Sequence, residues 1–382
     1  MIISHIVRFT HKPEEKMRKI NFIDSGYKRK SRKGGVTFSF TTDNGRRSLY
    51  FPSLKGLLKA KKKRPLLGID FGTGYIKAVL YRYDHGEFAL NKKAVVQLPE
   101  NAYDVDGALV NPDAIIESLR MIKDDLKLPS NYPVAFNVQS GHSCIQKLIT
   151  LPAMSQSDLD LCFPSEAENY LPFDINEIYM DFPIISRDEE RRQMTVLLAS
   201  IQKTEMDPYV DFLAQAGFSP KVATSSVTAV MNILEEGVDD FNEDYYCTID
   251  VGHTSCEVVF YEEGKPTFIR SVDSGLSAFQ LFKSNHPTAS GVALSLAYDK
   301  VRDHLFTKIR SEMDLYTATT IARKSKLTIM FGGINHLEGL VNQVEQESDI
   351  PTCFIGPFGS SMNNPHNLHE TQFFVAAGLA RM

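Results

Sequence analysis

A segment that occurs twice, at a constant offset of 180 residues, constrains the fold of this chain more than any other feature. The first copy covers residues 68–81 and the second covers residues 248–261, and each contains an Asp-x-Gly sequence at the same place. In both copies an apolar run precedes the turn and a β-rich run follows it, which predicts two strands joined by a tight turn. The duplication therefore predicts an α/β protein with two equivalent halves.

Both turns have the chemistry of a phosphate site. A glycine turn exposes successive backbone N–H groups that can surround phosphate oxygens, and an Asp at the end of a strand can hold a metal-bound water against them. The candidate residues are Asp70, Gly72, Thr73, Gly74 and Lys77 in the first copy, and Asp250, Gly252, His253 and Thr254 in the second. Lys77 could neutralise phosphate or pair with an acid, and His253 could be a surface side chain or a neutral donor near phosphate. We expect the two hairpins to face each other as a clamp around the phosphates of a nucleotide.

A third element lies near the end of the chain. Residues 327–331 are an apolar strand that leads into Gly332 and Gly333 and then into a helical stretch. Glycines at such a point let the backbone lie flat against a planar base and place a helix N-terminus beside the ligand. Alone, this pattern is also typical of an ordinary strand-to-helix turn, but it gains weight from the two hairpins.

These three elements, in this order, resemble the phosphate 1, phosphate 2 and adenosine motifs of the actin-like ATPase superfamily. A Glu-x-Glu-x-Tyr-x-Pro-Phe block at residues 166–173, preceded by Leu151-Pro152, is similar to a block that the PilM family of type IV pilus assembly proteins carries between the two hairpins. Gly356-Pro357-Phe358 and residues 376–381 extend the resemblance, which runs from about Phe51 to Met382.

The resemblance implies a two-lobed actin-like fold that binds ATP, with Mg²⁺ held through water by Asp70 and Asp250. Residues 65–147 and 206–228 would form the first lobe, residues 148–205 an inserted subdomain of the 1C type, and residues 229–382 the second lobe. A cleft beside the inserted subdomain would receive the N-terminal cytoplasmic peptide of PilN, a bitopic membrane protein. The chain would then be a cytoplasmic scaffold at the inner membrane, and self-association is compatible with that role.

Two departures from the family weaken the case for ATP hydrolysis. Residues 278–287 lack the Glu and Lys pair that would reach the ribose, and residues 223–228 lack an acid or Gln to position an attacking water. We therefore expect ATP binding with at most slow turnover and assign no catalytic residue. A filament-forming protein resembling FtsA is the main alternative, although that family continues into a membrane-binding helix and this chain stops at Met382. A small-molecule kinase would need an acidic base for its substrate hydroxyl, and none stands out.

Composition fits a two-lobed cytoplasmic protein. The 382 residues are 43% hydrophobic, which is enough for two cores, and no apolar run approaches 18 residues. Five scattered cysteines form no Cys-x-x-Cys pair, so we expect reduced thiols.

The first 64 residues differ from the rest in charge. They hold 18 Lys and Arg against 4 Asp and Glu, whereas the remainder holds 24 against 43. Residues 28–47 show no sustained period and predict a mobile segment, and residues 51–62 predict a short basic amphipathic helix. Residues 51–64 could lie on an anionic membrane surface or pack against protein. Nucleic acid and the acidic remainder of the chain are also compatible with such a tail, with nucleic acid the least expected.

Overall fold

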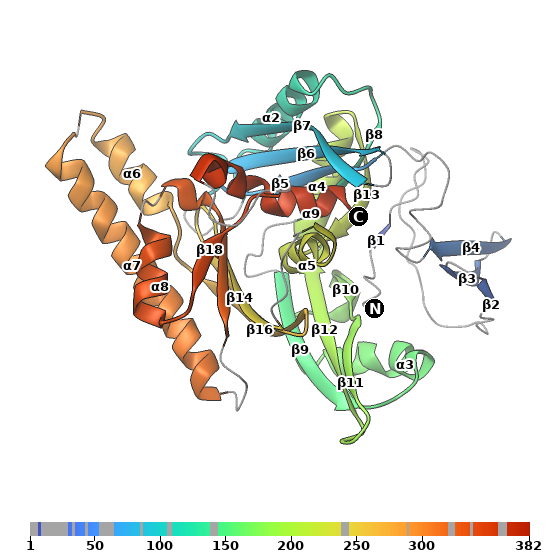
Figure 1. Ribbon diagram of the computed structural model, residues 1–382. Coiled ribbons are helices and arrows are strands. Elements are labelled where there is room, and N and C mark those ends of the chain that lie inside the picture. The colour runs from blue at the N-terminus through green and yellow to red at the C-terminus, as the bar shows by residue number, and fades with distance from the viewer. Residues whose placement is uncertain are drawn as a thin grey trace.

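The computed structural model of the chain describes residues 7–8, 30–32, 35–42, 45–52, 65–84, 87–104, 109–137, 144–237, 244–288, 290–319, 325–336, 339–357 and 365–382. Figure 1 shows two lobes, each a sheet with helices on it, and a smaller subdomain beside them. No helix within the described residues is long and apolar enough to cross a membrane.

The first lobe is a six-stranded sheet in the order β1-β13-β8-β5-β6-β7. Its strands are β1 (Val7–Arg8), β13 (Phe218–Thr224), β8 (Tyr132–Asn137), β5 (Leu67–Phe71), β6 (Tyr75–Asp84) and β7 (Glu87–Gln97). Strands β5, β6 and β7 form an antiparallel meander, and β8 runs parallel to β5. Helices α2 (Pro112–Asp125) and α4 (Lys203–Gln215) pack their apolar sides into one core with this sheet.

The second lobe repeats this arrangement. Its sheet has the order β16-β15-β14-β17-β18, in which β14 (Tyr245–Val251), β15 (Cys256–Glu262) and β16 (Lys265–Val272) form the meander. β17 (Leu327–Gly332) runs parallel to β14, as β8 does to β5, and β18 (Thr352–Phe354) follows at the edge. Helices α7 (Val292–Thr319) and α8 (Leu340–Ser348) pack into its core, and α6 (Ser277–Asn285) contacts α7. The predicted pair of equivalent halves is confirmed.

Two helices lie between the lobes and change the predicted boundary. Helix α5 (Ser226–Gly237) crosses residue 229, where we expected the second lobe to begin. Helix α9 (Phe374–Ala380), which follows η3 (Pro365–Phe373), packs against α5 and against β5, β6 and β8 of the first lobe (Figure 1). Every residue of α9 is buried, so the helix requires apolar cover on all sides, and the apolar cluster that covers it contains residues of α5 and of both sheets.

The inserted subdomain is a sheet of four strands with one helix. The long central strand β12 (Gln193–Gln202) pairs with β9 (Cys144–Pro152) along nearly its whole length and with β10 (Ile178–Asp181) and β11 (Ile184–Asp188) on its other side. Ser155 caps the N-terminus of helix α3 (Gln156–Ala167), because its side chain accepts a hydrogen bond from the Asp158 amide, and η1 (Ile175–Glu177) precedes β10. The subdomain therefore begins at 144 and ends at 202, close to the predicted limits of 148 and 205.

The N-terminal region differs from the sequence prediction. We expected no regular structure over residues 28–47, but β2 (Lys30–Arg32), β3 (Gly35–Thr42) and β4 (Gly45–Pro52) form a three-stranded sheet. Thr42 pairs with Gly45 in the register between β3 and β4, and the sequence Asn-Gly at 44–45 is common in β-hairpins. The helix expected at 51–62 is wrong at its start, since Phe51 and Pro52 end β4, and the rest of it lies outside the described residues.

Candidate functional site

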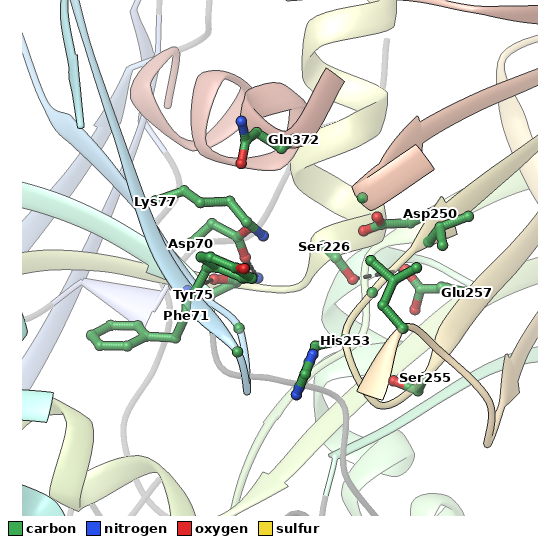
Figure 2. A pocket seen from close by; sticks show the side chains of 17 residues that line it. Asp70, Phe71, Tyr75, Lys77, Ser226, Asp250, His253, Ser255, Glu257 and Gln372 are labelled. Atoms are coloured by element: carbon green, nitrogen blue, oxygen red, sulfur yellow. Dashed lines mark hydrogen bonds and ion pairs between the residues drawn. The ribbon is translucent and has the colours of Figure 1, made fainter. Parts of the chain in front are cut away.

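A cavity lies between the two lobes, where the two predicted hairpins meet (Figure 2). Eight of the eleven predicted site residues line it: Asp70, Gly72, Gly74, Lys77, Asp250, Gly252, His253 and Gly333. The other three, Thr73, Thr254 and Gly332, contact these residues or each other. The structure thus brings together side chains that are up to 263 positions apart in the sequence.

The first hairpin holds its aspartate rigidly. Asp70, near the end of β5, is only 6% exposed, and its two oxygens have different partners. Oδ1 accepts a hydrogen bond of 2.8 Å from the Asn137 amide, and Oδ2 accepts one of 2.9 Å from Lys77 Nζ. Asn137 also accepts a bond from the Phe71 backbone N–H, which ties the end of β8 to the start of the turn. We expected Lys77 either to neutralise phosphate or to pair with an acid, and in the structure it forms an ion pair with Asp70.

The two turns have the same backbone geometry. In the first, the Gly72 amide donates to the Tyr75 carbonyl at 3.0 Å, and in the second the Gly252 amide donates to the Ser255 carbonyl at 2.9 Å. A Cβ atom would lie 2.9 Å from the Tyr75 oxygen at Gly72 and 2.5 Å from the Ser255 oxygen at Gly252. Both positions therefore require glycine, which explains why the Asp-x-Gly sequence recurs.

The glycine pair at 332–333 lies against the second hairpin. Gly332 has φ +83°, and a Cβ atom there would be 2.4 Å from Asp250 Oδ1. It therefore allows β17 to pass close to the Asp250 carboxylate, and any side chain at this position would be strained. Gly333 begins η2 (Gly333–His336) and lines the cavity.

The tips of the two hairpins touch. Thr73 Oγ1 and Thr254 Oγ1 share a hydrogen bond of 3.1 Å across the two lobes. The His253 ring lies on the backbone of Gly74, where a Cβ atom would be 2.7 Å from the ring. Burial and the nearby Lys77 charge lower the pKa of His253, so the ring is neutral at pH 7. Its Nδ1 atom is buried and makes no hydrogen bond to any described residue.

Acidic groups dominate the electrostatics of the cavity. Burial raises the pKa of Asp250 to about 7; Lys77 opposes this shift, and Asp70 and Glu257 add to it. Burial also raises the pKa of Glu257. For Lys77, burial alone would lower the pKa, but the Asp70 and Asp250 charges outweigh it and the pKa is raised. The wall of the cavity therefore carries three carboxyl groups and a single lysine.

Sequence analysis missed six polar residues that line this cavity: Tyr75, Asn137, Ser226, Ser255, Glu257 and Gln372. Glu257 had a signal, because it occupies the position in the second copy that Lys77 occupies in the first, at the same offset of 180. Asn137 is the parallel-strand neighbour of Asp70, which only strand pairing reveals. Residues 223–228 indeed contain no acid, but Ser226 in that segment donates a 2.7 Å hydrogen bond to Glu257, so the fold supplies a carboxylate there from another strand.

Direct coordination of a metal by protein side chains alone has little support here. In the part of the chain that the structure describes, no group of three His, Cys, Asp or Glu side chains is arranged to hold a metal ion. Two facing carboxylates, Asp70 and Asp250, fit instead a hydrated divalent cation that is held through its waters and a phosphate, as Mg²⁺ commonly is. The four cysteines whose side chains are described, Cys162, Cys247, Cys256 and Cys353, are free thiols.

Comparison with known proteins identifies the family. Residues 68–280 match the family described as type IV pilus assembly protein PilM. Among solved structures, a chain of the "PilM-PilN type IV pilus biogenesis complex" is 19% identical, with a TM-score of 0.70, and the match covers 83% of this chain and 98% of that one. Two further solved structures are more distant matches. The ethanolamine utilization protein EutJ from Carboxydothermus hydrogenoformans is 11% identical, with a TM-score of 0.45, and the match covers 84% of this chain and 90% of that one. MreB5 of Spiroplasma citri bound to ADP is 13% identical, with a TM-score of 0.45, and the match covers 83% of this chain and 95% of that one. The family match spans more than half of the chain, and the likeness to the PilM chain extends the actin-like fold over both lobes and the inserted subdomain. The chain belongs to the PilM family of type IV pilus assembly proteins.

Proposed function

We propose that this protein is a nucleotide-binding scaffold of type IV pilus assembly, located at the cytoplasmic face of the inner membrane. It binds Mg-ATP between its lobes and, beside its inserted subdomain, the N-terminal cytoplasmic peptide of a membrane protein similar to PilN. The observation that carries the nucleotide part is the pair of matching glycine turns that meet across one acidic cavity.

The two turns contact the phosphates of the nucleotide, and the glycine pair contacts its base. The Gly72 and Gly252 amides close their own turns, so the phosphate contacts fall to the amides of Thr73 and Gly74 and to those of His253 and Thr254. Phosphate oxygens between the tips would replace the Thr73–Thr254 hydrogen bond. Gly333, at the end of β17, is where a planar base can approach the backbone.

Asp70 and Asp250 are the residues that would hold Mg²⁺ through water. Such an ion supplies positive charge that offsets both the phosphates and the carboxylates. This chain's own residues fix where that charge is needed: Asn137 and Lys77 orient Asp70, and the close backbone of Gly332 limits the space around Asp250.

The peptide part is supported by family membership and by the position of the inserted subdomain. The PilM-PilN complex is, by its description, an assembly of a related protein with PilN. In this chain β12 runs directly into α4 of the first lobe, so the subdomain and the first lobe are joined side by side. Glu166 is half-buried and accepts a hydrogen bond from Tyr170, which makes this part of the family block a feature of the subdomain's own packing.

Calorimetric titration with Mg-ATP tests the nucleotide site. Asp70→Ala and Asp250→Ala should each weaken binding by about 1 to 3 kcal/mol, because each removes a charge-assisted contact. Asp273→Ala, an exposed acid outside the cavity, is the matched control and should bind as the wild type does. Unchanged affinity in both cavity variants would contradict the assignment.

A synthetic peptide from the N-terminus of the PilN-like protein of the same organism tests the partner. It should bind the full chain and fail to bind a chain in which a short linker replaces residues 144–202. Retained Mg-ATP binding by the shortened chain shows that both lobes still fold. Peptide binding to the shortened chain would remove the inserted subdomain from the proposed function.

A further inference from the structure

Three separate parts of the chain converge on one carboxylate at the wall of the cavity. Glu257 lies on β15 of the second lobe and lines the cavity. Its Oε2 accepts a 2.7 Å hydrogen bond from Ser226, the first residue of α5, as Figure 2 shows. Its Oε1 accepts a 3.3 Å hydrogen bond from the side-chain amide of Gln146, on β9 of the inserted subdomain. One side chain thus contacts the nucleotide cavity, an interlobe helix and the inserted subdomain.

Glu257 is placed to respond to charge in the cavity. It pairs directly across the β14–β15 ladder with Asp250, two residues before the glycine turn. Any ion bound by the turn or by Asp250 therefore acts on Glu257 through a short distance and a poorly solvated wall, where charges interact strongly. Phosphate charge bound in the cavity repels the Glu257 carboxylate, whereas a bound cation attracts it, and either can shift the two hydrogen bonds that the carboxylate accepts.

Gln146 lies where a movement of the Glu257 carboxylate can reach the inserted sheet. It lies within β9, which pairs with β12 from Cys144 to Pro152, so a shift at Gln146 moves the central pair of strands of the inserted sheet. β16 of the second lobe also contacts β9 and β11, which makes this edge the seam between subdomain and lobe. The Gln146 Oε1 atom is buried and has no hydrogen-bond partner among the described residues. Among the described residues the amide is thus held at its nitrogen by Glu257 and has no partner at its oxygen, so the hydrogen bond to Glu257 is the contact that fixes it.

The first hairpin has a different arrangement at the corresponding position. Lys77 lies there, opposite Asp70, and its side chain donates a hydrogen bond to Asp70 within its own lobe. The link to the inserted subdomain therefore depends on Glu257 being an acceptor at a position where the other copy has a donor.

We propose that Glu257 is the positioning residue through which occupancy of the nucleotide cavity changes the position of the inserted subdomain, by way of its hydrogen bond with Gln146. The proposal rests on nucleotide binding in the cavity and adds the route by which it reaches the subdomain. Coupling of this kind is reciprocal: whatever binds the subdomain and shifts β9 must change the affinity for Mg-ATP by the same factor that Mg-ATP changes its affinity.

Hydrogen exchange measured by mass spectrometry on the full chain, with and without saturating Mg-ATP, tests the route. In the wild type, Mg-ATP should change the exchange rate of the β9 amides at least twofold. Gln146→Ala removes the donor and should abolish that change while Mg-ATP still binds. Gln193→Ala, an exposed glutamine on β12 of the same sheet, should behave as the wild type does. Glu257→Gln, which keeps the shape and removes the charge, gives a second test in case Gln146→Ala fails to fold, and it should also lose the change.

The outcomes separate this inference from the proposed function. If Mg-ATP binds the wild type and β9 exchange does not respond, or responds equally in Gln146→Ala, the route is overturned and the nucleotide site stands. If Mg-ATP binds none of the proteins, the proposed function fails and the inference fails with it.

Discussion

The two hairpins of this protein share one backbone and differ in charge. Asp70 and Lys77 face each other across β5 and β6, and Asp250 and Glu257 face each other across β14 and β15 at the same register. The first pair is an ion pair of 2.9 Å that is supported by Asn137. The second pair is two buried acids whose pKa values are both raised. Duplication of a strand–turn–strand unit therefore preserved the turn and allowed the wall of the cavity to become asymmetric.

Because of this asymmetry, the two hairpins contribute different properties to the cavity. The first hairpin is neutralised within its own lobe, so it is complete before any ligand arrives. The second hairpin carries charge that is costly to bury and that a cation or a proton would offset. The first side therefore contributes rigidity, whereas the second contributes sensitivity to what is bound.

The largest expected effect comes from removing the lysine of the first hairpin. Lys77→Met leaves Asp70 as an uncompensated buried charge beside two further acids, and should lower the free energy of unfolding by about 3 kcal/mol. Glu257→Gln, at the equivalent position of the second hairpin, removes an acid from the same cluster and should change it by less than about 1 kcal/mol. Urea unfolding at pH 7.5 measures both. Equal losses in the two variants would break the comparison.

An intermediate effect is expected from pH. Asp250 has a pKa of about 7 in the folded chain, above the ordinary 3.8, so between these values the folded state holds a proton that the unfolded state has released. The free energy of unfolding should therefore fall as pH rises from 5 through 7, by at most about 1.4 kcal/mol per pH unit from this group, and level off about one pH unit above the folded pKa.

The Asp250→Asn variant isolates this contribution. Subtracting its curve of unfolding free energy against pH from the wild-type curve cancels the contributions of groups that both proteins share. One of these is His253, whose lowered pKa makes stability rise with pH, opposite to Asp250. Glu257 acts in the same direction as Asp250, since its pKa is also raised. A difference curve that is flat from pH 5 to 7 would show that Asp250 titrates normally.

The smallest effect is expected at the contact between the two hairpin tips, where each hairpin contributes a threonine. Thr73 and Thr254 share a hydrogen bond, and Thr73→Val or Thr254→Val should each cost about 1 kcal/mol in stability without nucleotide. The double variant should cost little more than either one alone, because both substitutions remove the same bond. Thermal unfolding of the three variants measures this, and simple additivity would mean that the threonines act independently.

Local chemistry made much of the candidate site predictable. The Asp70-x-Gly72 and Asp250-x-Gly252 turns could be predicted because a strand and a tight turn depend on residues that are adjacent in the sequence. Contacts within each turn exclude any side chain at the glycine. The third element at Gly332 and Gly333 was visible as a strand that leads into two glycines, although the contacts that require Gly332 come from Asp250 and Val251 on β14. The actin-like resemblance then assembled these three segments in the correct order. The identification of the bound nucleotide and of Mg²⁺ stays a prediction.

Predictions that needed distant partners fared less well. Helix α5 crosses the lobe boundary that we expected at 229, and α5 and α9 pack against residues of both sheets, which no local pattern records. The strands β3 and β4 were also missed, although Val36, Phe38 and Phe40 alternate with polar residues in the pattern of a β-strand.

The sequence by itself determined the two glycine turns, the glycine pair at the end of β17 and the family to which the chain belongs. Only the tertiary structure decided that Asn137 holds Asp70, that Glu257 takes the place opposite Lys77 in the cavity, and that Gln146 reaches Glu257 from a different subdomain. The physical reason is the range of the interactions. Turns and helices are fixed by neighbours a few residues apart, whereas these hydrogen bonds join residues 67 and 111 positions apart, and they form only after two sheets and an insertion have packed around the same cavity.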